Sequence, residues 1–211
     1  MCRLLCVRSA EDFSIPAHLE KFALIAKNSK EYQGHGWGCA FKENGEWRIY
    51  KTVAPIWEDD FSRFGSTKLL IAHARSAYMD RDIIVENNMP FIDEQTVFIF
   101  NGELQGVRIS EKGRIGAEKI FNFILRFDKG DLKRAMEKAL PIIEKKTRYI
   151  KAMNMIIANT DGIFVSSQFN EDADYFTMYF KQEDNRLIIC SEYYPNQNNW
   201  QKIETKKVKV F

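Results

Sequence analysis

The sequence has 211 residues, a formal net charge of +2 and a hydrophobic fraction of 45%. A chain of this length buries a full core, and its composition is that of a folded globular protein, so we expect a single domain over residues 1–211. Lysine and arginine are balanced by aspartate and glutamate, and no long basic stripe indicates nucleic-acid binding.

The chain has no apolar run long enough to span a bilayer and no signal peptide pattern, so we expect a cytoplasmic protein without a membrane partner. Its cysteines are Cys2, Cys6, Cys39 and Cys190, and they lack CxxC spacing. This spacing argues against a zinc site and against a disulfide framework. We therefore expect free thiols, no metal and no cofactor.

The first seven residues, Met1-Cys2-Arg3-Leu4-Leu5-Cys6-Val7, form an apolar run typical of a buried strand. Removal of Met1 would leave the α-amine of Cys2 beside its own thiol. An α-amine has a pKa of about 7.7–8.0, so it can take the thiol proton and one residue can supply nucleophile and base. The alternative is that Cys2 is only a small residue at a chain end.

The next segments predict a helix and then a hairpin. Apolar residues at helical spacing indicate a helix over residues 12–28, and Asn44-Gly45 between apolar runs predicts a hairpin. Gly34, Gly36 and Gly38 stand at every second position before it. They leave one face of the strand bare, which suits either close backbone packing or a ligand.

Two later strands are expected to end in polar residues. Residues 53–66 look irregular, and the strand over 68–74 ends at His73-Ala74-Arg75. These side chains either find partners in the fold, or Arg75 faces a pocket as an anion-binding fork. The strand over 95–100 is expected to stop at Asn101-Gly102. An amide and an unhindered N–H there suit an oxyanion hole, while the alternative is a plain turn.

The second half predicts a helix pair followed by strands. Helices are expected over 116–127 and 131–146, packed on one face of a sheet, with Asp131 as an N-cap. Strands follow over 153–159, 162–167, 176–181 and 187–191, then a lysine-flanked edge strand over 202–209, with turns at Asp161-Gly162 and Asp184-Asn185. This order indicates an α+β fold.

Taken in order, these motifs resemble the class II glutamine amidotransferases, which use an N-terminal cysteine nucleophile, and in particular the stand-alone branch of that family. The matching segments are Met-Cys-Arg-Leu-Leu at 1–5, Gly36-Trp37-Gly38, Ile71-Ala72-His73-Ala74-Arg75, Asn87 with Pro90-Phe91, Asn101-Gly102-Glu103-Leu104 and Ser191-Glu192. The resemblance covers most of the chain.

The resemblance implies a four-layer αββα sandwich of the N-terminal nucleophile hydrolase type, with two stacked antiparallel sheets. It implies that Cys2 attacks a carboxamide carbon while Asn101 and the Gly102 N–H hold the oxyanion. Arg75 would bind the α-carboxylate of glutamine, and His73, Trp37 and Gly38 would belong to the substrate-binding region. Ammonia would leave, and water would hydrolyse the γ-glutamyl thioester to glutamate.

The sequence departs from the family pattern at several positions. Histidine is usual where this chain has Met89 and Phe100, threonine where it has Tyr78, glycine where it has Cys6, and an ammonium-binding aspartate where it has Gly116. Loss of that carboxylate removes a charge-assisted contact worth about 1.5–3 kcal/mol. We therefore expect weaker glutamine binding or a substrate without the ammonium, with Glu118 or Glu103 as candidate replacements.

Three functions stay open at this point. The chain releases ammonia from glutamine or a related γ-glutamyl amide, passing it to a separate synthase subunit because 211 residues leave no room for an acceptor domain. Alternatively, it hydrolyses a γ-glutamyl peptide bond. The third function is that of a catalytically silent relative that binds a small molecule or a protein.

Overall fold

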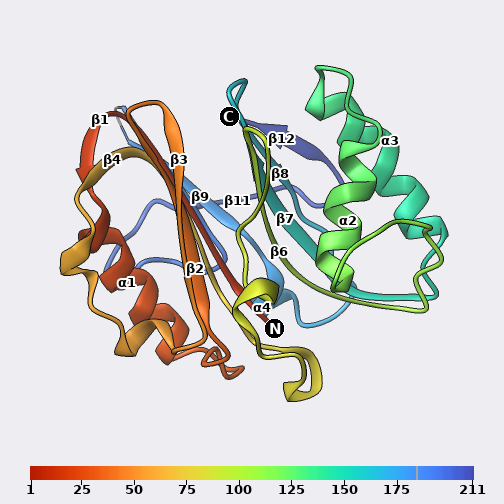
Figure 1. The fold of residues 1–211 in the computed structure, drawn as a ribbon, viewed down its shortest axis with the longest axis horizontal. Coiled ribbons are helices and arrows are strands. Elements are labelled where there is room, and N and C mark those ends of the chain that lie inside the picture. The colour runs from red at the N-terminus through yellow and green to blue at the C-terminus, as the bar shows by residue number, and fades with distance from the viewer. Residues whose placement is uncertain (184) are drawn as a thin grey trace.

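The computed structural model describes residues 1–183 and 185–211, so the turn predicted at Asp184-Asn185 lies partly outside the described residues. Over these residues the chain forms a seven-stranded and a five-stranded antiparallel sheet, stacked face to face (Figure 1). Helix α1 (Ile15–Lys27) covers the outside of the first sheet, and α2 (Gly116–Leu125) with α3 (Leu132–Lys145) covers the second. The predicted four-layer α+β sandwich is confirmed.

The two sheets combine strands that are far apart in the sequence. The larger sheet has the order β11-β9-β10-β1-β4-β2-β3, and the smaller has the order β12-β8-β7-β6-β5. The larger sheet contains β1 (Arg3–Ser14), β2 (Trp37–Glu43), β3 (Glu46–Thr52), β4 (Ser66–Ala74), β9 (Tyr179–Glu183), β10 (Arg186–Cys190) and β11 (Gln201–Lys202). The smaller contains β5 (Phe91–Asp93), β6 (Thr96–Gln105), β7 (Tyr149–Ala158), β8 (Ile163–Ser166) and β12 (Val208–Val210).

Short helices occupy the remaining connections. The 3₁₀ helices are Ile56–Glu58, Phe61–Arg63, Tyr78–Asp80 and Val85–Asn87, and a single helical turn, α4 (Ala173–Phe176), precedes β9. No helix among the described residues has the length and apolar character needed to cross a membrane.

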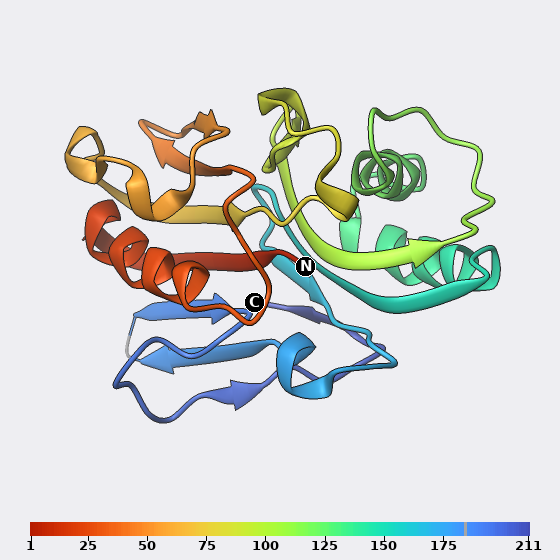
Figure 2. The ribbon, with the colours of Figure 1, turned by 90° about the horizontal axis from the view of Figure 1, so that it is seen from below.

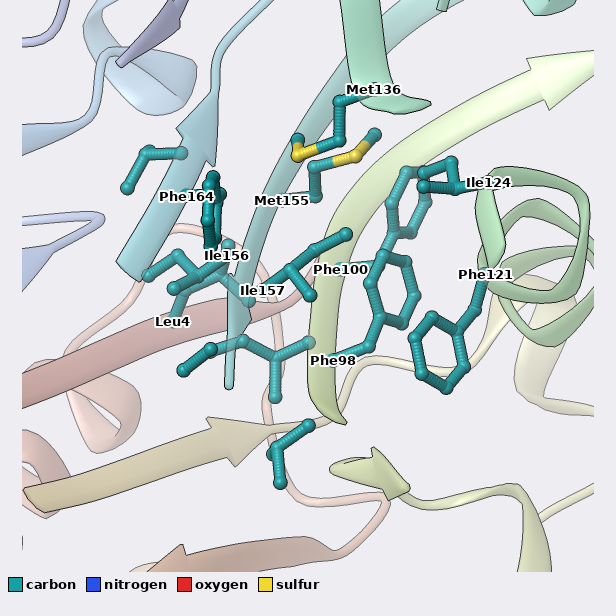
Figure 3. Packing of buried hydrophobic residues seen from close by; sticks show 14 of the residues in the cluster. Leu4, Phe98, Phe100, Phe121, Ile124, Met136, Met155, Ile156, Ile157 and Phe164 are labelled. Atoms are coloured by element: carbon teal, nitrogen blue, oxygen red, sulfur yellow. The ribbon is translucent and has the colours of Figure 1, made fainter. Parts of the chain in front are cut away.

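Strand alternation divides the core between the layers. On β1, Leu4 packs in the core between the sheets, while Leu5 packs in the cluster beneath α1, because successive side chains of a strand point to opposite faces. On β6, Phe98 stacks on Phe121 of α2, with ring centroids 4.9 Å apart (Figure 3). The odd-numbered residues of β6, including Asn101, therefore face the larger sheet.

The helix termini follow the sequence signals. The Ser14 side chain accepts a hydrogen bond from the Ala17 N–H and caps α1, and Pro16 lies in the first turn, where a missing N–H costs nothing. The predicted N-cap Asp131 accepts from the Arg134 N–H at 2.9 Å and begins α3.

Three sequence predictions about strands are wrong. The strand expected over 176–181 begins only at Tyr179, because Phe176 belongs to α4. Strand β6 does not stop at Asn101-Gly102 but runs to Gln105, because β7 begins at Tyr149 and supplies paired backbone, with Asn101 opposite Asn154. Pairing overrides the turn preference of Asn-Gly. The C-terminal segment forms two short edge strands instead of one, with β11 on the larger sheet and β12 on the smaller.

Candidate active site

A cavity of about 720 Å³ lies beside the start of β1. The N-terminus lies between the two sheets in both views (Figures 1 and 2). The cavity wall includes Cys2, Arg75, Phe100 and Gly102, together with residues of the 106–115 segment and the first turn of α2. The cavity therefore joins residues from both sheets and from a helix layer.

Cys2 is the cysteine that lines this cavity. Its side chain is partly exposed, and its Sγ lies 3.6 Å from the Ser76 carbonyl oxygen. Cys6, Cys39 and Cys190 are buried, and burial raises the pKa of the Cys6 and Cys190 thiols to about 12. Only Cys2 among the four thiols is accessible to a ligand in the cavity.

Asn101 is fully buried, yet neither its Nδ2 nor its Oδ1 has a hydrogen-bond partner among the described residues. Asn154, directly opposite on β7, donates to the Phe176 carbonyl and accepts from the Ser167 hydroxyl and the Gln168 N–H. An unpaired buried amide costs about 1–3 kcal/mol. Asn101 itself is not part of the cavity wall, but its neighbours Phe100 and Gly102 are, so its unpaired amide lies in the core directly beside the cavity.

His73 links the two sheets near this point. Its Nε2 lies 3.2 Å from the Phe100 carbonyl oxygen of β6, and its backbone pairs with Leu4 of β1. Burial lowers the pKa of His73 to about 3, so the imidazole is neutral and Nε2–H donates this bond. His73 does not line the cavity, and its contact fixes the position of β6 against β4.

Arg75 lines the cavity although only 6% of the residue is exposed. Its Nη1 donates to Asn88 Oδ1 at 3.0 Å, and its Nη2 donates to the Asp82 carbonyl at 2.9 Å. Burial lowers the pKa of the guanidinium, and nearby Cys2 and Asp82 oppose that shift. A guanidinium stays charged in proteins and has five N–H donors, so these two contacts leave it able to bind an anion.

The structure does not bring Trp37 into the cavity. Trp37 packs beneath α1 with Tyr50 and Phe61, and its Nε1 donates to Asp59 Oδ2 at 2.8 Å. The side chain faces away from the space between the sheets, since the odd positions of β2 contribute to the outer cluster. The predicted substrate contact therefore has no geometric support at this residue.

Gly36 and Gly38 make room for a neighbouring backbone segment. Gly36 has a φ of 107°, and a Cβ there would lie 2.2 Å from Asn88 Nδ2. A Cβ on Gly38 would lie 2.6 Å from the Met89 carbonyl oxygen. Of the two interpretations of these glycines, close backbone packing fits the structure, and it presents Met89 to the cavity wall.

Four positions at which the sequence departs from the family pattern line this cavity, namely Tyr78, Met89, Phe100 and Gly116. Glu103 also lines it, two residues beyond Asn101 on the same face of β6, and accepts from Gln105 Nε2 at 2.6 Å. Glu118 is instead held by the Arg114 guanidinium and N–H, which lower the pKa of its carboxyl group. Of the two candidate carboxylates, Glu103 is the one that reaches the cavity.

The basic part of the cavity wall was not predicted from the sequence. It consists of Arg81, Arg114 and Lys119. They lie in an irregular segment, in the approach to α2 and on α2 itself, so no periodic pattern marks them as neighbours. Only the ion pair between Arg114 and Glu118 could have been predicted, because the two residues are four apart around the start of α2.

Comparison with solved structures identifies the fold. A glutamine phosphoribosylpyrophosphate amidotransferase from B. subtilis, complexed with ADP and GMP, aligns over 90% of this chain and 42% of its own, with a TM-score of 0.64 and 16% identity. A glutamine aminotransferase class-II domain protein from Silicibacter pomeroyi aligns over 100% of this chain and 98% of its own, with a TM-score of 0.67 and 14% identity. An allosteric regulatory enzyme of purine biosynthesis aligns over 90% of this chain and 42% of its own, with a TM-score of 0.64 and 14% identity.

The first neighbour is a glutamine amidotransferase and the second a glutamine aminotransferase class-II domain protein, and the predicted resemblance in fold is confirmed. The chain spans 42% of the length of two of the three neighbours. No family model and no curated protein matches the sequence.

Proposed function

We propose that this chain is an N-terminal cysteine amidohydrolase of the glutamine amidotransferase type, which releases ammonia from glutamine or a related γ-glutamyl amide. The observation that carries the proposal is the buried, unpartnered Asn101 amide between two residues that line the same cavity as Cys2. The fold shared with glutamine amidotransferases supports it.

The reaction begins after Met1 is removed. The α-amine of Cys2 takes the thiol proton, and Sγ attacks the γ-carbonyl carbon of the substrate. The carbonyl oxygen becomes an oxyanion that accepts hydrogen bonds from Asn101 Nδ2 and the Gly102 N–H. The proton held by the α-amine passes to the leaving nitrogen, the C–N bond breaks, and ammonia departs from a Cys2 thioester.

Water completes the cycle. The α-amine accepts a proton from water as the water oxygen attacks the thioester carbon, and the same oxyanion site stabilises the second tetrahedral intermediate. Breakage of the C–S bond then returns the thiol and releases glutamate. These reaction steps use only groups of the chain, the substrate and a water molecule.

Charged groups of the cavity orient the substrate in this proposal. The guanidinium of Arg75 holds the α-carboxylate of the substrate. The Glu103 carboxylate holds the α-ammonium and replaces the family aspartate, because this chain has Gly116 at the position of that aspartate. Support for Glu103 comes from its position on the cavity wall and from the engagement of Glu118 by Arg114. If ammonia is transferred, its acceptor belongs to a separate synthase subunit.

A second candidate, hydrolysis of a γ-glutamyl peptide bond, is favoured by the size and lining of the cavity. Its volume of about 720 Å³ is within the range of pockets that hold drug-sized ligands, which are much larger than glutamine. Beyond Cys2 the wall is apolar at Met89 and Phe100 and basic at Arg81 and Lys119. Such a wall suits an amine portion with an apolar body and an acidic end.

The test measures ammonia release from glutamine together with amine release from a series of γ-glutamyl peptides. Cys2→Ser should abolish both, and Asn101→Ala should lower turnover on the order of 10²–10³-fold. Unchanged turnover in Asn101→Ala would remove Asn101 from the mechanism. Intact-mass measurement, before and after labelling with a glutamine-like electrophile, tests the catalytically silent alternative, which predicts retained Met1 and no adduct at Cys2.

A further inference from the structure

The carbonyl oxygen of Met1 is held by two buried side chains. Gln33 Nε2 and the Tyr175 hydroxyl each donate a hydrogen bond to it, both at 2.5 Å. Gln33 follows α1 and is fully buried, and Tyr175 belongs to α4 and is 5% exposed. Two segments that are 142 residues apart in the sequence therefore meet at the peptide bond that precedes Cys2.

These two side chains are rigidly supported. The Tyr175 hydroxyl lies 3.1 Å from Gln33 Nε2, which also donates to the Glu31 carbonyl at 2.8 Å. The guanidinium of Arg3 lies 4.1 Å from the centre of the Tyr175 ring and donates to the Tyr175 and Ser191 carbonyls. The pair thus forms a buried polar pocket on the backbone side of Cys2.

One acceptor in this pocket is unused. Gln33 Oε1 is buried and has no hydrogen-bond partner among residues 1–183 and 185–211. A buried acceptor left unpaired costs about 1–3 kcal/mol, so a donor is expected to bind there in the working protein. While the Met1 carbonyl is present, it holds the Nε2 end of the amide; once that carbonyl is lost with Met1, a rotation about the last side-chain bond turns Oε1 toward the Cys2 nitrogen.

The donor that belongs in this pocket is the α-amine of Cys2. The Met1 carbonyl is bonded directly to the Cys2 nitrogen, so the donors that hold that carbonyl lie next to the amine that Met1 removal creates. We propose that Gln33 and Tyr175 form the receptor for the Cys2 α-amine, with Gln33 Oε1 accepting from it and the Tyr175 hydroxyl bonding to it or to a water in place of the lost carbonyl. This inference rests on the proposed function, and it makes both side chains positioning residues for the general base.

The charges around the receptor favour neutral partners for the amine. Arg3 stacks on Tyr175 and pairs with Glu192, Arg75 lines the adjoining cavity, and Glu31 lies 3.5 Å from the Met1 ammonium. Burial raises the pKa of Tyr175 to about 12, so its hydroxyl stays uncharged. A neutral amide and a neutral hydroxyl orient the amine without fixing its proton, which a carboxylate at the same place would do.

The test uses protein shown by intact mass to have lost Met1, and it compares wild type with Gln33→Glu. The rate of Cys2 alkylation by iodoacetamide is measured against pH. The new carboxylate should stabilise the ammonium form and move the acid limb of the profile upward by about one pH unit or more. Gln182→Glu, the same change on an exposed residue of β9, should leave the profile in place.

Tyr175→Phe provides a second variant if Gln33→Glu does not fold. Loss of one hydrogen bond worth about 0.5–1.5 kcal/mol should slow both alkylation and kcat by about two- to tenfold, with KM for the amide substrate unchanged because the substrate does not contact this pocket. A merely structural role would not separate kcat from KM or shift a pH profile.

The outcomes separate this inference from the proposed function. Amide hydrolysis together with unshifted alkylation profiles would overturn the receptor and leave the function standing. A shifted profile without amide hydrolysis would support the receptor and overturn the function. A native protein that retains Met1 would overturn both.

Discussion

Asn101 and Asn154 form a matched pair that separates a residue kept for a ligand from one kept for the fold. They lie opposite each other on β6 and β7 and both are fully buried. Asn154 makes three hydrogen bonds, whereas neither polar atom of Asn101 has a partner among the described residues. We predict opposite effects on stability when each is replaced by leucine, which has nearly the same shape.

The magnitudes follow from the hydrogen bonds. Asn101→Leu removes a buried unpaired amide and should raise the free energy of unfolding by about 1–3 kcal/mol. Asn154→Leu loses three bonds worth about 0.5–1.5 kcal/mol each and leaves their partners unpaired, so it should lower the free energy of unfolding by about 3 kcal/mol or more. Only Asn101→Leu should lose activity without losing stability.

The assay is urea unfolding of the substrate-free protein, followed by tryptophan fluorescence and circular dichroism. With a slope of about 1–3 kcal/mol/M, the two midpoints should differ by more than about 1 M urea. Equal destabilisation by the two substitutions would mean that the Asn101 amide is bonded in the folded protein. That result would refute the assignment of Asn101 to a ligand.

Three further predictions follow from charged and titratable groups. Arg75→Lys lacks the planar fork and should raise KM for glutamine at least about tenfold in steady-state ammonia release. Glu103→Gln should raise the same KM by about tenfold or more, the equivalent of a lost charge-assisted bond. Glu118→Gln should change the KM little, because Arg114 already binds that carboxylate. Equal effects of the two substitutions would place the substrate ammonium elsewhere. Burial lowers the pKa of His18 to about 4 and of His73 to about 3. Between pH 6.5 and those values only the unfolded chain binds the protons, so stability falls as the pH drops, by about 1.4 kcal/mol per pH unit for each histidine. Urea midpoints at pH 7 and pH 5 measure this loss, and His18→Gln should reduce it.

Local sequence patterns predicted the elements but not their partners. Asn44-Gly45 gave the correct hairpin, and the helical spacing around Phe22 gave the correct α1, because both signals are short-range. The end of β6 was wrong, since only the pairing of Gly102 with Met153 of β7 keeps that strand going. Pairing across some fifty residues of sequence leaves no local trace.

The candidate site was predictable where a motif lies on the cavity wall and not where distant segments meet. Cys2, Arg75 and Gly102 line the cavity wall, whereas Asn101, His73 and Gly38 do not, and Trp37 belongs to the outer cluster. The contact between Gln33 and Tyr175 had no sequence signal, because neither residue carries a pattern and the fold alone brings them together.

The alternation that builds the core between the sheets also delivers the site. Leu4 and Cys6 on β1, Ile71 on β4 and Ile99 on β6 face this core. Side chains two residues apart on a strand share a face, so Cys2, His73 and Asn101 lie on the same faces as these core residues. Asn101 therefore lies in the dry core beside the cavity, which is why its amide is desolvated before a substrate arrives. In such surroundings a donor aimed at a developing negative charge is worth more than in water and needs no reorganisation. The cost of that arrangement is paid in stability, which is the quantity that the leucine substitutions measure.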